Sequence, residues 1–336
     1  MDEYNEAFRL TDERMHEAGF SERTLDQMNL PENQTVEHGE NRIPYAIFGD
    51  RDARIVVPNA TPYLTFMDPH FKLRLAAKQA ALGEDFCVVG IGAYEPAEQA
   101  LSLEQRRKIK TGDFSPLSER MVRVVDSLKL NEEQSVMFDG YSLGGDIAVQ
   151  TTHDILFDEH KGVCSVEALS VSECARMVRR GAALVTIAMA QSGKRLVENI
   201  VDSEVPSLLE AWNIDPNTDM KTTKKAVNSA VNRGAIKYWT SGIQDNWAIT
   251  RGFGTDASKR QIIDLADETQ LLMLITRAKD SKVFPKQSLQ DIATHTRERE
   301  GVLLGTEDND HSGDDNIRRS AARILYLAQS LRHPEA

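Results

Sequence analysis

Short, continuous apolar runs alternate with helix-like segments along most of this chain, and this alternation constrains its fold more than any other feature. Each run lacks a polar face, as expected of a strand that is buried on both sides. Strands of this type separated by helices predict a parallel sheet with helices on both faces. The apolar runs are 53–59, 86–92, 135–139, 162–171, 271–277 and 301–306, and the helix-like segments include 71–83, 115–130, 146–157 and 285–296.

The chain divides into four predicted segments. Residues 1–34 form a helical N-terminal extension, and the sheet begins after them with a hairpin that turns at Gly39. The alternation of strands and helices holds over 35–173 and resumes over 268–336. Between them, 174–267 is mostly helix-like and shows no good strand. We therefore predict one α/β domain in two parts, interrupted by a helical cap or lid insertion.

Composition limits the classes of partner. The chain has 336 residues, of which 40% are hydrophobic, so it can bury a large core. Its formal net charge is −12, which disfavours binding to the phosphates of nucleic acids. Three cysteines do not form a disulfide framework, and the N-terminus is polar and acidic, unlike a signal peptide. We expect a cytoplasmic protein that does not insert into membranes and needs no cofactor or metal, and its self-association is left open.

The segment Gly140–Gly144 reads GYSLG and lies between an apolar run and a helix-like segment. A serine at such a turn takes a strained backbone conformation that pushes its hydroxyl out of the sheet. Side chains two residues before and two after Ser142 would collide, so glycine is expected at both positions. Asp139 and Asp146, which flank the turn, are interpreted as strand-end and helix-start residues. The pattern makes Ser142 a candidate nucleophile, and the alternative is a serine that only turns the chain among glycines.

A serine hydroxyl needs a base to act as a nucleophile. His311 lies in an acidic loop after the last apolar run, just before the final helix-like segment. Asp280 lies in the loop after the preceding apolar run. The carboxyl ends of parallel strands meet at one edge of a sheet, so Ser142, Asp280 and His311 are expected to gather there.

From about residue 35 to its end, the sequence resembles the α/β-hydrolase superfamily. The early hairpin and the run ARIVV are similar to the opening strands of that superfamily, and SERMVRVVDSLKL followed by SVMFDGYSLGG is similar to its nucleophile elbow. The segments LLMLITRAKDSKVFP and NDHSGDD resemble its acid and histidine loops. The resemblance implies the α/β-hydrolase fold, with a mostly parallel, doubly wound sheet and a helical cap insertion.

The same resemblance implies a role for each residue of a catalytic triad. Ser142 is the nucleophile, and His311 is the general base and then the general acid. Asp280 orients His311 and stabilises its imidazolium form. Some members of the superfamily carry the acid after the preceding strand of the sheet, which makes Glu173 the alternative to Asp280.

The resemblance also implies an oxyanion hole made of backbone N–H groups. Leu143 supplies one donor, and Ala60 supplies the other by its position after the ARIVV strand. The loop around Ala60 reads PNATP where many members have His-Gly, and the side chain of Asn59 is the alternative donor. Candidates for the lining of the substrate pocket are Asn59, Tyr141, Trp212, Trp239 and Trp247.

These residues predict a serine hydrolase that cleaves a small or medium carboxylic ester, or a related acyl compound, through an acyl-enzyme. Its partner would be a small acyl substrate, because a cap that encloses the serine disfavours a polymer. Two alternatives remain open. One is a non-catalytic binding or regulatory protein with the hydrolase fold, and the other is an acyltransferase or perhydrolase that uses the same triad.

Overall fold

The structure is a computed structural model. It describes residues 6–7, 9–11, 13–14, 30–60, 68–94, 99–157, 160, 163–174, 215, 217–219, 221–229, 242–279, 281, 286–296, 301–307 and 316–332.

One eight-stranded sheet forms the centre of the molecule, with the strand order β1-β2-β4-β3-β5-β6-β7-β8. The pairs β1–β2 and β2–β4 are antiparallel, and all the other neighbouring strands are parallel. The predicted hairpin is confirmed, because His38 pairs with Asn41 across the turn at Gly39. The strands are β1 (Gln34–His38), β2 (Asn41–Phe48), β3 (Ile55–Ala60), β4 (Phe86–Ile91), β5 (Ser135–Tyr141), β6 (Val166–Ser172), β7 (Leu272–Ala278) and β8 (Val302–Glu307).

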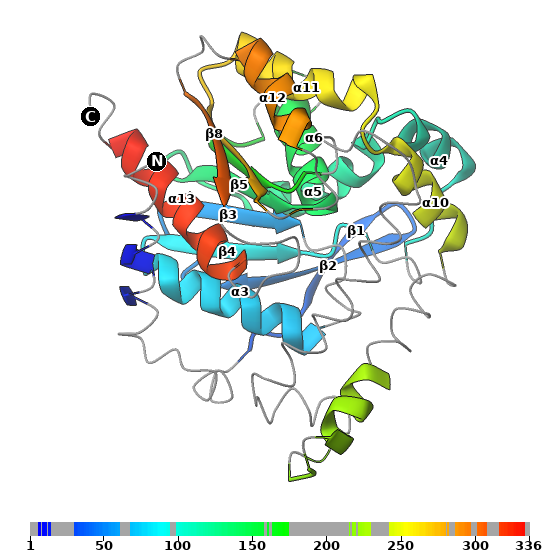
Figure 1. Ribbon diagram of the computed structural model, residues 1–336, viewed down its shortest axis with the longest axis vertical. Helices are drawn as coiled ribbons and strands as arrows, with labels where there is room; N and C mark the ends of the chain where they lie inside the picture. The colour runs from blue at the N-terminus through cyan, green and yellow to red at the C-terminus, as the bar shows by residue number, and fades with distance from the viewer. Residues whose placement is uncertain are drawn as a thin grey trace.

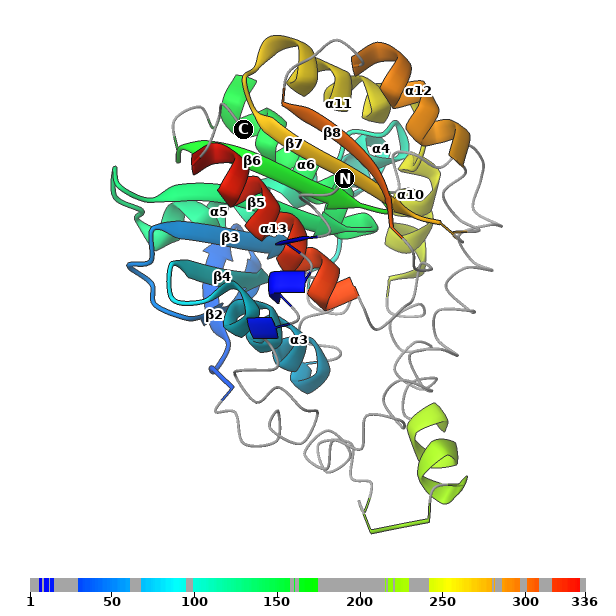
Figure 2. The ribbon, with the colours of Figure 1, turned by 60° about the vertical axis from the view of Figure 1, so that its left-hand side comes forward.

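Helices cover both faces of the sheet (Figure 1, Figure 2). On one face, α3 (Asp68–Leu82) packs against α13 (Asn316–Arg332). The other face carries α5 (Ser115–Leu128), α6 (Leu143–Phe157), α11 (Asp256–Glu268) and α12 (Lys286–Thr296). Beside them, α4 (Leu103–Lys110) packs against α10 (Ile243–Gly252). This arrangement confirms the predicted α/β class with a mostly parallel, doubly wound sheet.

Each face of the sheet has its own apolar core. Val56 and Phe138 point into the core on the α5–α6 face, whereas Val57 and Met137 point into the core on the α3–α13 face. Adjacent residues of one strand thus serve opposite cores, because side chains alternate between the faces of a sheet. This alternation decides which side chains of β3 and β5 can meet above each face.

Parts of the predicted extension and insertion contribute to these cores. Ala7, from the N-terminal extension, is buried in the α3–α13 core, and Arg14 donates a hydrogen bond to the Leu82 carbonyl. Ile249 of α10 and Leu265 of α11 belong to the α5–α6 core. The C-terminal part of the 174–267 segment therefore packs with the sheet, and the division into a core and a cap stays a prediction.

Candidate active site

The turn between β5 and α6 places Ser142 at the carboxyl edge of the sheet. Ser142 has a φ of +54°, in the left-handed region that residues other than glycine rarely adopt. Its N–H donates to the Ser172 carbonyl (3.1 Å), and its own carbonyl accepts from the N–H of Gly145 (3.0 Å) and Asp146 (3.3 Å). These bonds join the turn to β6 and start the helix. Strain held in this way by its surroundings is typical of a functional position.

Three glycines allow the chain to turn so tightly. A Cβ at Gly140 would collide with the carbonyl of Gly144, and a Cβ at Gly144 would lie 2.5 Å from the carbonyl oxygen of Ala60. A Cβ at Gly145 would lie 3.3 Å from the Cβ of Cys174. The first two approaches leave no room for a side chain, and the third leaves little. Gly144 therefore lets the end of β3 rest directly on the elbow.

The two residues predicted to supply oxyanion donors lie on either side of this contact. Leu143 is the first residue of α6, where backbone N–H groups have no partner within the helix and the helix dipole is positive. Ala60 is the last residue of β3, and its carbonyl oxygen packs against Gly144. The structure thus places Leu143 directly after Ser142 and the end of β3 against Gly144. An oxyanion hole formed by these two N–H groups stays a prediction.

The strands that lead to the other predicted triad residues end at the same edge. Strands β5, β6, β7 and β8 are consecutive parallel neighbours. Ala278 and Glu307, the last residues of β7 and β8, are register partners. Asp280 and His311 themselves lie outside the described residues. Their contact with Ser142 stays a prediction.

Glu173, the alternative acid, follows β6 directly and is buried, with a φ of +51°. Its Oε1 accepts a hydrogen bond from the Ala278 N–H (2.7 Å), and its Oε2 accepts one from the Ser281 hydroxyl (2.5 Å). Its own N–H donates to the Thr276 carbonyl (3.0 Å). The Glu173 side chain therefore binds both Ala278 and Ser281, on either side of position 280, which lies outside the described residues.

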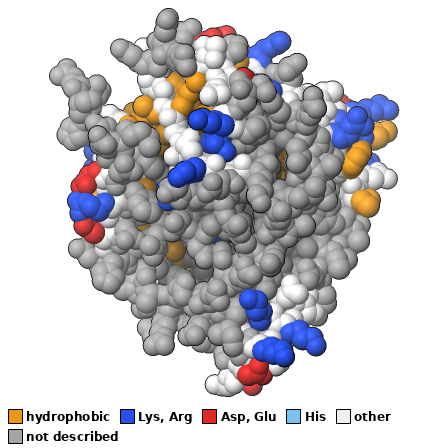
Figure 3. All heavy atoms as spheres, in the orientation of Figure 1, with side chains coloured by type: hydrophobic (Ala, Val, Ile, Leu, Met, Phe, Trp, Pro, Cys, Tyr) orange, Lys and Arg blue, Asp and Glu red, His pale blue; other side chains and the backbone are white. Residues whose placement is uncertain are grey.

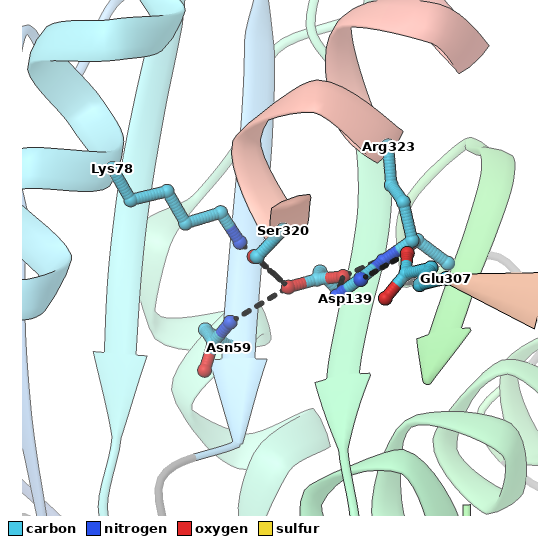
Figure 4. Close-up of polar contacts among 7 residues, drawn as sticks. Asn59, Lys78, Asp139, Glu307, Ser320 and Arg323 are labelled. Atoms are coloured by element: carbon cyan, nitrogen blue, oxygen red, sulfur yellow. Dashed lines mark hydrogen bonds and ion pairs between the residues drawn. The ribbon is translucent and has the colours of Figure 1, made fainter. Parts of the chain in front are cut away.

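A buried carboxylate lies beneath the elbow, at Asp139 of β5. Its Oδ2 accepts from the Lys78 ammonium (2.7 Å), the Ser320 hydroxyl (2.6 Å) and the Asn59 amide (3.1 Å), as Figure 4 shows. Its Oδ1 accepts from the Ser170 hydroxyl (2.6 Å). Asp139 and Asp146 lie near the end of β5 and in the first turn of α6, as interpreted from the sequence. In addition, the Asp139 carboxylate links side chains from two helices and two other strands.

Arg323 extends this cluster to a second carboxylate. Its Nη1 donates to Oε1 of Glu307 (2.9 Å), its Nε donates to the Ser170 hydroxyl (3.0 Å), and its Nη2 lies 3.7 Å from Oδ1 of Asp139. Burial opposes ionisation of Asp139, but the positive charges of Lys78 and Arg323 outweigh it and lower the pKa of that carboxyl to about 2. Within the part of the chain that the structure describes, Lys78 and Arg323 thus lie against the carboxylates of Asp139 and Glu307.

The pocket candidates lie in different surroundings. The Asn59 side chain donates to Asp139, and Tyr141 is half-buried at the end of β5. Trp247 is 52% exposed on α10, and Figure 3 shows apolar side chains beside Lys and Arg where α4 and α10 lie. Trp212 and Trp239 lie outside the described residues. A pocket lined by the tryptophans therefore stays a prediction.

The described residues include no group of three or more His, Cys, Asp or Glu side chains that could hold a metal ion. Among the helices formed by those residues, none combines the length and the apolar character needed to cross a bilayer.

Solved structures with the same architecture span nearly the whole chain. The carboxylesterase CesB (YbfK) from Bacillus subtilis superposes with a TM-score of 0.53 at 14% identity, covering 99% of this chain and 98% of the other. MGS-M2, an α/β-hydrolase enzyme from a Medee basin deep-sea metagenome library, gives 0.54 at 11% identity, with 88% and 98% covered. A bromoperoxidase from Bacillus anthracis gives 0.51 at 10% identity, with 88% and 100% covered. No protein-family model and no curated protein sequence matches the chain.

These neighbours, together with the sheet order and the strained serine, define the class: the chain has the α/β-hydrolase fold. The resemblance stated from the sequence is confirmed at that level. At 10–14% identity the neighbours establish the fold and not the reaction.

Proposed function

We propose that the protein is a serine hydrolase that cleaves a small or medium carboxylic ester, or a related acyl compound, with Ser142 as the nucleophile. The observation that carries the proposal is the conformation of Ser142. A non-glycine residue at φ +54° joins β5 to α6, and its neighbour Gly144 is in contact with the end of β3. A serine held in this way presents its hydroxyl at a sheet edge where a helix begins.

In the proposed reaction, the Ser142 hydroxyl oxygen attacks the carbonyl carbon while His311 takes the hydroxyl proton. The carbonyl oxygen becomes an oxyanion that faces the N–H groups of Leu143 and Ala60. Collapse of this intermediate expels the alcohol, which receives the proton from His311 and leaves an acyl-enzyme. A water molecule then attacks the acyl carbon and gives its proton to His311. The bond to the Ser142 oxygen breaks, His311 returns the proton to that oxygen, and the carboxylic acid departs.

Asp280 is the proposed partner of His311, and the surroundings of Glu173 support this choice. Both Glu173 oxygens accept hydrogen bonds from the turn 278–281. A carboxylate engaged in this way suits the role of fixing the turn that carries Asp280. Asp280 would then fix the tautomer of His311 and stabilise its charged form.

The test compares turnover of a short-chain p-nitrophenyl ester by wild type and by Ser142→Ala, Asp280→Asn and Glu173→Gln. Ser142→Ala should abolish turnover, and Asp280→Asn should lower kcat by about 10⁴-fold. Glu173→Gln keeps an acceptor oxygen for the turn, and should retain more than a tenth of the activity. The proposal is wrong if the folded wild-type protein stabilises on binding acyl ligands but turns none over. That result would favour the binding-protein alternative.

A further inference from the structure

Asn59 and Asp139 sit opposite each other on neighbouring parallel strands, next to the two backbone segments of the proposed oxyanion hole. Asn59 precedes Ala60 in β3, and Asp139 lies three residues before Ser142 in β5. The two residues are register partners, and the Asn59 amide donates to Asp139 Oδ2 at 3.1 Å. Strand alternation puts this bond on the α3–α13 face while Ala60 belongs to the α5–α6 core.

Asp139 is a rigid point of attachment. Its side chain is only 2% exposed, and its other partners come from α3, α13 and β6 rather than from β3. A hydrogen bond from a neutral amide to an ionised carboxylate is stronger than one between neutral groups. The bond therefore ties the end of β3 to a carboxylate that three other elements hold in place (Figure 4).

The Asp139 carboxylate has hydrogen-bond donors other than the Asn59 amide. The same Oδ2 atom already accepts from the Lys78 ammonium and the Ser320 hydroxyl. The residue that gains from the bond is Asn59, whose strand ends at Ala60, in contact with Gly144. The sequence from Pro58 to Pro62 reads PNATP and contains no glycine.

We propose that Asp139 and Asn59 are positioning residues that hold the Ala60 N–H in place for the oxyanion, an inference that rests on the proposed function. The carboxylate fixes the Asn59 side chain, and the Asn59 side chain fixes the backbone of the next residue against the elbow. Loss of the Asn59 amide allows the end of β3 to shift. Misplacement of a catalytic group by about 1 Å can cost about 100-fold in rate.

The test uses two variants that each remove one neutral donor from the same oxygen of Asp139. Asn59→Ala breaks the link to β3, whereas the matched control Ser320→Ala breaks a bond to α13. The measurements are the rate of phosphonylation by a fluorophosphonate, and kcat and KM for a p-nitrophenyl ester. We expect Asn59→Ala to slow phosphonylation and lower kcat by about 10- to 100-fold with KM changed less than about twofold. Ser320→Ala should stay within about twofold of wild type in the same measurements. The melting temperatures of Asn59→Ala and Ser320→Ala should fall below that of wild type by similar amounts.

Asp139→Ala, which removes the acceptor of the Asn59 amide, distinguishes positioning from direct donation by Asn59 to the oxyanion. If Asn59 acts through Asp139, adding Asn59→Ala to Asp139→Ala should lower the rate little further, because the two residues form one unit. A full additional loss in the double variant would overturn the proposal, as would equal rates for Asn59→Ala and Ser320→Ala. If the variant at position 139 does not fold, the comparison of Asn59→Ala with Ser320→Ala decides alone. A wild-type protein with neither adduct nor turnover would instead overturn the proposed function, and this inference with it.

Discussion

Removal of the negative charge of Asp139 should destabilise the protein far more than the loss of one hydrogen bond. The Asp139 carboxylate, which is 2% exposed, lies 2.7 Å from the Lys78 ammonium and 3.7 Å from the Arg323 guanidinium. Among the residues that the structure describes, Asp139→Asn leaves these two buried cations with the Glu307 carboxylate, which Arg323 contacts. Breaking a buried ion pair from one side typically costs about 3–5 kcal/mol. Ser320→Ala removes only a hydroxyl donor and should cost about 1 kcal/mol.

The same substitution has a pH dependence whose direction follows from the lowered pKa. The Asp139 carboxyl titrates near pH 2 in the folded protein, against an ordinary value of 3.8. Its stabilising contribution is therefore complete above about pH 4 and is lost as the pH falls towards 2. That difference in pKa corresponds to about 2 kcal/mol of the stability difference between wild type and Asp139→Asn. The remaining part of this stability difference does not depend on pH, because it reflects lost hydrogen bonds.

The assay is urea unfolding followed by circular dichroism, for wild type, Asp139→Asn, Ser320→Ala and the double variant Lys78→Met with Asp139→Asn. The double variant restores the balance of charge and should recover part of the stability that Asp139→Asn loses. The reasoning would be refuted by an Asp139→Asn midpoint equal to that of Ser320→Ala. A double variant less stable than Asp139→Asn alone would refute it equally.

Three further predictions concern the elbow and its surroundings. Gly144→Ala should slow phosphonylation by at least about 10-fold, because its Cβ would lie 2.5 Å from the Ala60 carbonyl oxygen; an unchanged rate would mean that β3 can move away freely. Burial raises the pKa of the Cys87 and Cys164 thiols to about 12, so both should resist iodoacetamide at pH 8 and react once urea unfolds the protein. Glu173→Ala removes the acceptor that fastens the turn after β7, and proteolysis should cut that turn faster than in Glu173→Gln; equal cutting would contradict the role.

Most of the fold could be predicted from the sequence, because its signals are local. A buried strand such as β5 is a continuous apolar run, and its residues fix the face on which each side chain lies. The glycines around Ser142 also predict the elbow, since a turn so tight excludes a Cβ at two positions. The structure confirms both the sheet and the strained serine.

The polar cluster around Asp139 could not be predicted in the same way. Its members, which include Lys78, Ser170 and Arg323, are distant in sequence, and each is unremarkable in its own segment. Two tertiary features bring them together: β5 lies between β3 and β6 in the sheet, and α3 and α13 pack together on one face. One signal was present: an aspartate inside an otherwise apolar strand needs a buried partner. The hydrogen bonds from Ala278 and Ser281 to Glu173 could not be predicted either, because those residues are distant from Glu173 in the sequence.

The most direct test of the proposed function is to locate the covalent adduct by mass spectrometry after treatment with a fluorophosphonate. The Ser142 oxygen should displace fluoride from phosphorus, giving one adduct on the peptide that contains Ser142. Ser142→Ala should give none, and His311→Ala should give it far more slowly. An active, folded wild-type protein without an adduct on Ser142, or an adduct that persists in Ser142→Ala, would contradict the assignment of this residue as the nucleophile.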